Sequence, residues 1–221
     1  MVNPQKSIMP NARMLFLLPF ALTLGSQRIG DGAAHIEARA GEPVLILTAP
    51  MELALRRFDP EFAIRRLVDY PPYMWRAGCT WSPDCARVLY RLKPREAPFA
   101  VIGDFNGDGI LDVVMDGENR NNGRRIVLLS NQKSFSASEV DSPVRISVDI
   151  ESSRSNKGAT RGWEDGVDVG LSWAKPGTYR TPYEPQALVL NTDGFIVSYF
   201  EKASVLYYLR NFKWNKFTLS D

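Results

Sequence analysis

The chain has 221 residues, of which 44% are hydrophobic and 24% are charged, a composition typical of a folded globular protein. Lysine and arginine number 27 against 25 aspartate and glutamate residues, which gives a formal net charge of +2. This balance disfavours an electrostatically driven nucleic-acid binder, because such a protein needs a basic surface that displaces counterions from phosphates.

The first 25 residues have the layout of a secretory signal peptide. Lys6 and Arg13 precede an apolar stretch, 14–24, and the small residue Gly25 follows it. The stretch is shorter than the roughly 20 apolar residues that a spanning helix needs, although an uncleaved anchor is the alternative. Removing the segment takes away two basic residues and leaves 25 basic against 25 acidic ones. We therefore expect a secreted or periplasmic mature protein with no membrane span.

The N-terminal part of the mature chain predicts a leader and two short helices. Residues 26–43 are polar and weakly patterned, and we expect a poorly ordered leader there. A single β-rich domain then covers 44–221, since no linker-like composition divides it. Between residues 51 and 70 the apolar positions recur every three or four residues, and Pro60 interrupts them. This spacing predicts helices on either side of Asp59-Pro60.

Cys79 and Cys85 are the only cysteines. In an exported chain an isolated close pair favours a disulfide, which would close a small loop. No histidine lies near them to complete a zinc site, and the spacing is not that of a thioredoxin-like dithiol.

From Arg87 onward the sequence consists of short β-type runs separated by turn residues. It predicts a mainly β fold: a compact antiparallel β domain behind a small N-terminal helical segment. The segments Asn191-Thr-Asp193-Gly194 and Arg210-Asn-Phe-Lys213 each separate two runs and predict two successive hairpins. The predicted strands are 87–92, 98–103, 112–116, 124–130, 143–150, 166–173, 186–191, 194–200, 204–210 and 213–219.

One loop between two of these strands carries oxygen side chains at alternate positions. Asp104, Asn106, Asp108 and Asp112 offer side-chain oxygens, and Ile110 offers its carbonyl. A calcium ion takes roughly 6–8 oxygen ligands, so one short loop that supplies several of them predicts a calcium site. The loop is not an EF-hand, because its twelfth position is Met115 where that motif needs a bidentate glutamate.

The stretch 99–116 resembles the FG-GAP or VCBS repeat family, whose blades carry a D-x-[DN]-x-D-G-x-x-D loop in a β-hairpin. The resemblance implies a calcium-loop hairpin of the kind found in integrin-like propellers and many secreted bacterial proteins. A propeller has about 4–8 blades of roughly 40–50 residues, so this chain is too short for one, and a partial propeller is the alternative. A tight Asn/Asp/Gly turn without metal is the alternative for the loop itself.

No motif for nucleophilic catalysis, zinc hydrolysis or nucleotide binding occurs, and the single histidine, His35, lies in the predicted leader. A glycosidase needs only two carboxylates, for which Glu118, Glu164, Asp165 and Asp168 are candidates by residue type alone. The aromatic residues Trp163, Tyr179 and Tyr183, in Gly/Pro-rich surroundings, are candidates for ligand stacking, although β domains also use such residues in cores and rims.

The sequence therefore favours an exported, non-enzymatic, calcium-binding β-domain protein that binds or adheres to an extracellular or periplasmic partner, either protein or carbohydrate. The rival interpretation is a calcium-stabilised hydrolase that acts on carbohydrate or another polymer. A pair of acids converging on an aromatic cleft would favour the hydrolase, whereas a surface without such a pair would favour the binding module.

Overall fold

The computed structural model describes residues 32–70, 92–120, 122–132, 134–141, 169–199 and 203–221. Within them the protein is mainly β, with antiparallel strand pairs and one α-helix, which confirms the expected fold class. The described strands form open sheets, without a closed barrel or propeller. None of the described helices is long and apolar enough to cross a membrane. The predicted signal segment, both cysteines and the predicted strand 143–150 lie outside the described residues.

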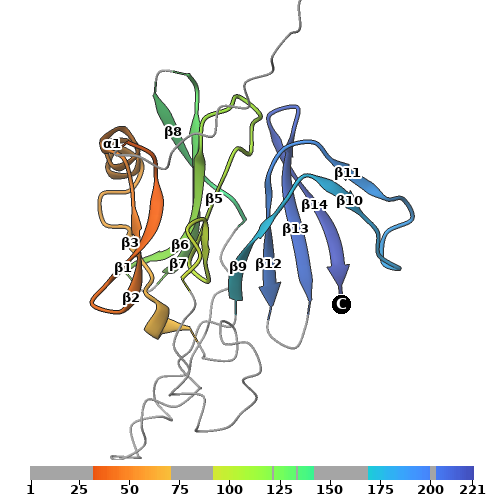
Figure 1. The fold of residues 1–221 in the computed structure, drawn as a ribbon, viewed down its shortest axis with the longest axis horizontal. Helices are drawn as coiled ribbons and strands as arrows, with labels where there is room; N and C mark the ends of the chain where they lie inside the picture. The colour runs from red at the N-terminus through yellow and green to blue at the C-terminus, as the bar shows by residue number, and fades with distance from the viewer. Residues whose placement is uncertain (1–31, 71–91, 121, 133, 142–168, 200–202) are drawn as a thin grey trace, which may run out of the picture.

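Two sheets form the centre of the molecule (Figure 1). Sheet I has the strand order β4-β5-β6-β7-β8, and β3 adds to β6. Its strands are β3 (Ala63–Ile64), β4 (Glu96–Ala97), β5 (Ala100–Gly103), β6 (Asp112–Asn119), β7 (Asn122–Ser130) and β8 (Phe135–Glu139). Sheet II has the order β14-β13-β12-β9. Its strands are β9 (Val169–Ala174), β12 (Gly194–Tyr199), β13 (Ser204–Arg210) and β14 (Lys213–Ser220).

Each sheet has a smaller element on its outer face, so four layers stack across the molecule (Figure 1). The helix α1 (Ala49–Phe58) and the hairpin of β1 (His35–Arg39) and β2 (Glu42–Ile46) cover sheet I. The hairpin of β10 (Gly177–Tyr179) and β11 (Leu188–Leu190) covers sheet II.

The middle core lies between the two sheets and is built by alternate residues of their strands. Val101, Val114 and Val127 of sheet I are fully buried there against Phe195 and Val197 of sheet II. Their neighbours in sheet I, such as Ile102 and Met115, point to the opposite face and bury against α1 and the β1–β2 hairpin. The strands of sheet I are therefore apolar on both faces, because both faces are covered.

The helix α1 was predicted, and its sequence explains both of its ends. Pro50 stands in the first turn, where its missing N–H costs no helical hydrogen bond, and Asp59-Pro60 ends the helix. Met51 and Leu55, four residues apart, are buried against sheet I. The second predicted helix is wrong: β3 and a 3-10 turn at Leu67–Asp69 occupy that segment.

A glycine of β6 explains why the chain after Pro60 pairs with a strand and is not helical. Ala63 and Ile64 pair with Glu118 and Gly117. A Cβ on Gly117 would lie 2.2 Å from the Phe62 ring and 2.4 Å from the Ala63 carbonyl oxygen. The missing side chain thus makes room for the incoming backbone, a tertiary effect that local helical spacing does not reveal.

The leader expected at 26–43 differs from the structure over its described part. Residues 35–46 form the β1–β2 hairpin, and Ile36 and Leu45 bury in the core beside α1. Ala40 and Gly41 make the two-residue turn with φ values of 51° and 85°, and Gly at the second position suits such a turn. Each strand has only five residues, which is too short for an alternation that stands out in the sequence.

Of the two hairpins predicted near the C-terminus, the second is confirmed and the first is wrong. β13 pairs with β14 across Asn211 and Phe212. β11 pairs with β10, whereas β12 pairs with β9 and β13, so Asn191–Gly194 connects two layers and makes no hairpin turn. The strands β8 and β10 were not predicted.

Candidate calcium loop

The predicted calcium loop joins β5 to β6 at the end of sheet I where Gly103 pairs with Asp112. Gly107 and Gly109 adopt φ values of 79° and 82°, a left-handed conformation that favours glycine. A Cβ on Gly107 would also lie 2.9 Å from Thr192, so this position excludes a side chain for two reasons. The two glycines allow the chain to reverse within a few residues.

Asp104 organises the loop through its carboxylate. One oxygen accepts hydrogen bonds from the Gly107 and Asp108 N–H groups at 2.7 and 3.1 Å, and the other accepts one from the Gly109 N–H at 2.9 Å. The first aspartate of the motif therefore holds the three following N–H groups that the turn leaves without a backbone partner.

Asn106 and Asp108 meet at Ser130, the last residue of β7. The Asn106 amide donates to the Ser130 carbonyl at 2.9 Å and to its hydroxyl at 3.1 Å, and the Ser130 hydroxyl is bonded to the Asp108 carboxylate. Burial would raise the pKa of Asp108, but hydrogen bonds from Ser130, the Ile110 N–H and Asn106 outweigh it and lower that pKa. Asp108 is therefore ionised, and its carboxylate links the middle of the loop to β7.

Asp112, the last acid of the motif, is fully buried. Its two oxygens accept the N–H groups of Ser130 at 2.7 Å and Phe105 at 2.9 Å. Burial raises the pKa of Asp112 to about 6 in spite of these donors, and the charge of Asp108 adds to the increase. A dication beside this carboxylate would favour its ionised form.

A second loop, from sheet II, is hydrogen-bonded to the first. The Asp104 N–H donates to the Asp193 carboxylate at 2.9 Å, and the Asp193 N–H donates to the Asp104 carbonyl at 3.0 Å. The Thr192 hydroxyl donates to the Phe105 carbonyl at 3.2 Å. The sequence predicted a hairpin turn at Asn191–Gly194 and gave Asp193 no part in the site. The one signal that could have identified Asp193 is that Asn191-Thr-Asp193-Gly194 repeats the Asn-x-Asp-Gly order of the calcium loop.

Phe105 continues this connection into the middle core. Its buried ring lies 5.9 Å from the rings of both Phe195 and Trp214, in edge-to-face arrangements. The loop therefore contributes to the packing of the two sheets through a backbone pair and an aromatic anchor.

The donor set fits calcium by its chemistry. All of its groups are oxygens, three of them carboxylates, and hard dications prefer such ligands. As the side chains stand, no group of three His, Cys, Asp or Glu residues in the described part of the chain is placed to hold a metal. The carboxylates face N–H groups of the protein. Each oxygen that accepts one hydrogen bond retains capacity for a ligand bond, so a metal requires the side chains to turn within the loop.

The other predicted site residues do not come together with the loop or with one another. The Tyr179 hydroxyl donates to the Lys175 carbonyl at 2.7 Å, and its ring packs on the outer core of sheet II. Tyr183 is 49% exposed. Glu118 is exposed and lies 4.0 Å from Arg65, and His35 lies in β1 beside Glu37. Trp163, Glu164, Asp165 and Asp168 lie outside the described residues.

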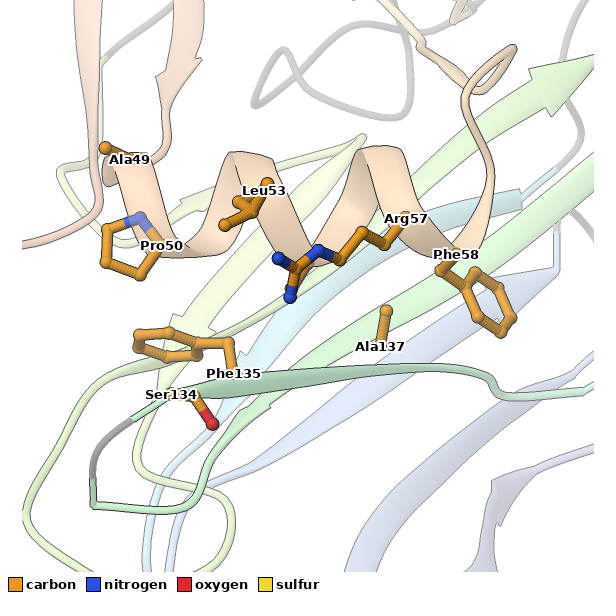
Figure 2. A pocket seen from close by; sticks show the side chains of 9 residues that line it. Ala49, Pro50, Leu53, Arg57, Phe58, Ser134, Phe135 and Ala137 are labelled. Carbon is orange, nitrogen blue, oxygen red and sulfur yellow. The ribbon is translucent and has the colours of Figure 1, made fainter.

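Two grooves bear on the hydrolase alternative. Figure 2 shows the larger one, about 660 Å³, between α1 and β8, with Pro50, Leu53 and Phe135 along its walls. No acidic residue lines it. The second, about 490 Å³, lies between α1 and the β1–β2 hairpin and is lined by Glu52 and Asp59.

Asp59, the buried acid of the second groove, already has partners within the protein. The Asp59 carboxylate accepts a hydrogen bond from Asn119 at 2.7 Å and one from the Glu61 N–H at 3.2 Å, and it pairs with Arg124. Neither groove therefore presents two free carboxylates across an aromatic cleft, which is the arrangement that glycoside hydrolysis needs.

Comparison with known proteins gave no match to a family model, a curated protein or a solved structure.

Proposed function

We propose that this chain is an exported, calcium-stabilised β-domain protein that acts by binding a partner outside the cytoplasm. One observation carries the proposal: a loop with three aspartates and an asparagine lies at the junction of the two sheets. Its resemblance to the FG-GAP loop and the signal-like N-terminus support calcium binding in an exported protein. Calcium concentrations in such compartments suit loops of moderate affinity.

In this proposal calcium has a structural role. Without metal, Asp104, Asp108 and Asp112 place like charges in one turn, which opposes the compact loop. A bound dication removes this repulsion. Since the same loop is hydrogen-bonded to Asp193 and inserts Phe105 between the sheets, ordering it also strengthens the contact between sheet I and sheet II.

Neither of the two grooves described above presents two free acids across an aromatic cleft, which supports a binding role over hydrolysis. The buried acids of the described residues, Asp59, Asp112, Asp116 and Asp193, have hydrogen-bond or ion-pair partners inside the protein. An acid with such partners stabilises the fold and is less available for a reaction.

Calorimetric titration of the purified protein with calcium tests the proposal. We expect one site with the wild type, none with Asp108→Ala, and unchanged binding with Glu52→Ala, an exposed acid of α1. No heat of binding with a folded wild type, or equal binding by Asp108→Ala, would contradict the proposal.

A further inference from the structure

The turn between β13 and β14 holds a large aromatic side chain in a conformation that suits glycine. Asn211 and Phe212 have φ values of 52° and 59°. Two-residue turns of this kind favour Gly at the second position, and a bulky residue there is strained. Phe212 is nevertheless 95% exposed, so its ring gains nothing from burial in the fold. A strained and exposed phenylalanine indicates a role outside the folding of the chain.

The residues around Phe212 are basic. Arg210 and Lys213 flank the turn as the last pair of the hairpin, and both are exposed. Neither takes part in an ion pair within the described residues. The tip thus combines one apolar ring with two cations that no described residue neutralises by an ion pair.

The tip lies at the same end of the molecule as the calcium loop (Figure 1). Trp214, two residues after Phe212, packs its ring 5.9 Å from Phe105 of that loop. Ile110 of the loop is 37% exposed at this end. Two apolar side chains and two cations therefore occupy one end of the described structure.

We propose that this end of the protein binds an anionic lipid surface, with Phe212 inserted among the head groups and Arg210 and Lys213 against their phosphates or carboxylates. A protein partner needs a continuous apolar patch or a groove in which side chains can bury. Neither groove described above includes the tip. A lipid surface needs only isolated apolar side chains that insert, together with cations that attract the anionic lipids.

The charge of the calcium loop makes this binding respond to metal, and in this respect the inference rests on the proposed function. Asp104 and Asp108 place negative charge at the same end as Arg210 and Lys213. Without calcium these carboxylates oppose an anionic surface, and with calcium they do not. We therefore expect calcium to strengthen binding to anionic vesicles.

Cosedimentation with vesicles tests the proposal, with phosphatidylcholine alone compared with a mixture of phosphatidylcholine and phosphatidylserine. We expect the wild type to bind the anionic vesicles more tightly, and more so in calcium than in chelator. Phe212→Gly should weaken binding roughly tenfold or more, because it removes the inserted ring. Lys213→Gln should weaken it about fivefold.

Three controls separate this role from a structural one. Phe212→Gly should leave Tm unchanged or raise it, because glycine relieves the strained turn. Phe212→Trp should retain binding, and Val68→Ser, which changes a residue 60% exposed in the 3-10 turn after β3, should not alter it. A wild type that binds no anionic vesicles, or a Phe212→Gly variant that binds as well as the wild type, would overturn the proposal. Binding that needs Phe212 but is equal in calcium and in chelator would support the lipid surface and contradict only the calcium assignment.

Discussion

Asp104 and Asp193, which lie 89 positions apart in the sequence, hold each other by two hydrogen bonds. The N–H of Asp104 donates to the side chain of Asp193, and the N–H of Asp193 donates to the backbone of Asp104. A Cβ on Gly103 would lie 2.9 Å from the Asp193 Cβ, so a glycine before the loop allows this close approach. The pair joins the candidate calcium loop of sheet I to the start of β12 in sheet II.

Asp193→Ala should therefore destabilise the protein by about 1–3 kcal/mol, because it leaves the Asp104 N–H without its acceptor at a partly buried contact. Urea denaturation measures this change. Glu42→Ala, which removes an exposed acid from β2, is the control and should have little effect. Equal stability of the Asp193 variant and the wild type would show that the pair does not hold the two sheets together.

Gly117→Ala should destabilise the fold by roughly 1–3 kcal/mol, because the new methyl group meets the Ala63 carbonyl and the Phe62 ring. Gly123→Ala on β7 is the matched control. The nearest atom there is the end of the Arg65 side chain at 2.9 Å, which can move away. Thermal unfolding of both variants checks the prediction, and similar Tm values for the two would count against the pairing of β3 with β6.

Asp59→Asn should cost about 1–3 kcal/mol at neutral pH, since it removes the charge that Arg124 pairs with. Burial would raise the pKa of Asp59, but hydrogen bonds from Asn119 and the Glu61 N–H and the charge of Arg124 lower it below 3.8. A lowered pKa stabilises the folded state above the ordinary pKa, and this contribution is lost as the pH falls through the lowered value.

The difference in unfolding free energy between wild type and Asp59→Asn should accordingly shrink as the pH falls below 3.8. Urea denaturation at a series of pH values measures it. A difference that stays constant from pH 7 to pH 3 would mean that the ionised form of Asp59 contributes nothing specific.

The prediction of a disulfide between Cys79 and Cys85 is tested by intact mass before and after reduction of the exported protein. We expect the mass to increase by two hydrogen atoms on reduction, because oxidising compartments favour a disulfide in a close pair of this kind. Two thiols that alkylate freely without reductant would make the prediction wrong.

Local signals in the sequence predicted the elements whose structure depends on local chemistry. Asp59-Pro60 marks the end of α1. Short apolar runs between turn residues mark β5, β6 and β7 of sheet I and β12, β13 and β14 of sheet II. The alternate oxygens from Asp104 to Asp112 located the loop that joins β5 to β6.

The features that sequence analysis missed depend on contacts between distant segments. Ala63 joins β6 because Gly117 leaves room for it. Asp193 looked like part of a hairpin turn, since Asp-Gly between two apolar runs is a strong hairpin signal. No hairpin forms there, because the two runs beside Asp193 lie in different layers. β11 pairs with β10 and covers sheet II, whereas β12 is a strand of sheet II. Ser130 gave no signal, because a serine at the end of a strand is common.

The measurement that tests the central claim most directly is the thermal unfolding of the wild type in calcium and in chelator. If the loop binds calcium only in the folded state, a metal concentration 100 times Kd should add about 2.7 kcal/mol to the free energy of unfolding, and Tm should rise by several degrees. Asp108→Ala should show no such rise. Equal Tm values for the wild type in the two conditions would contradict the account.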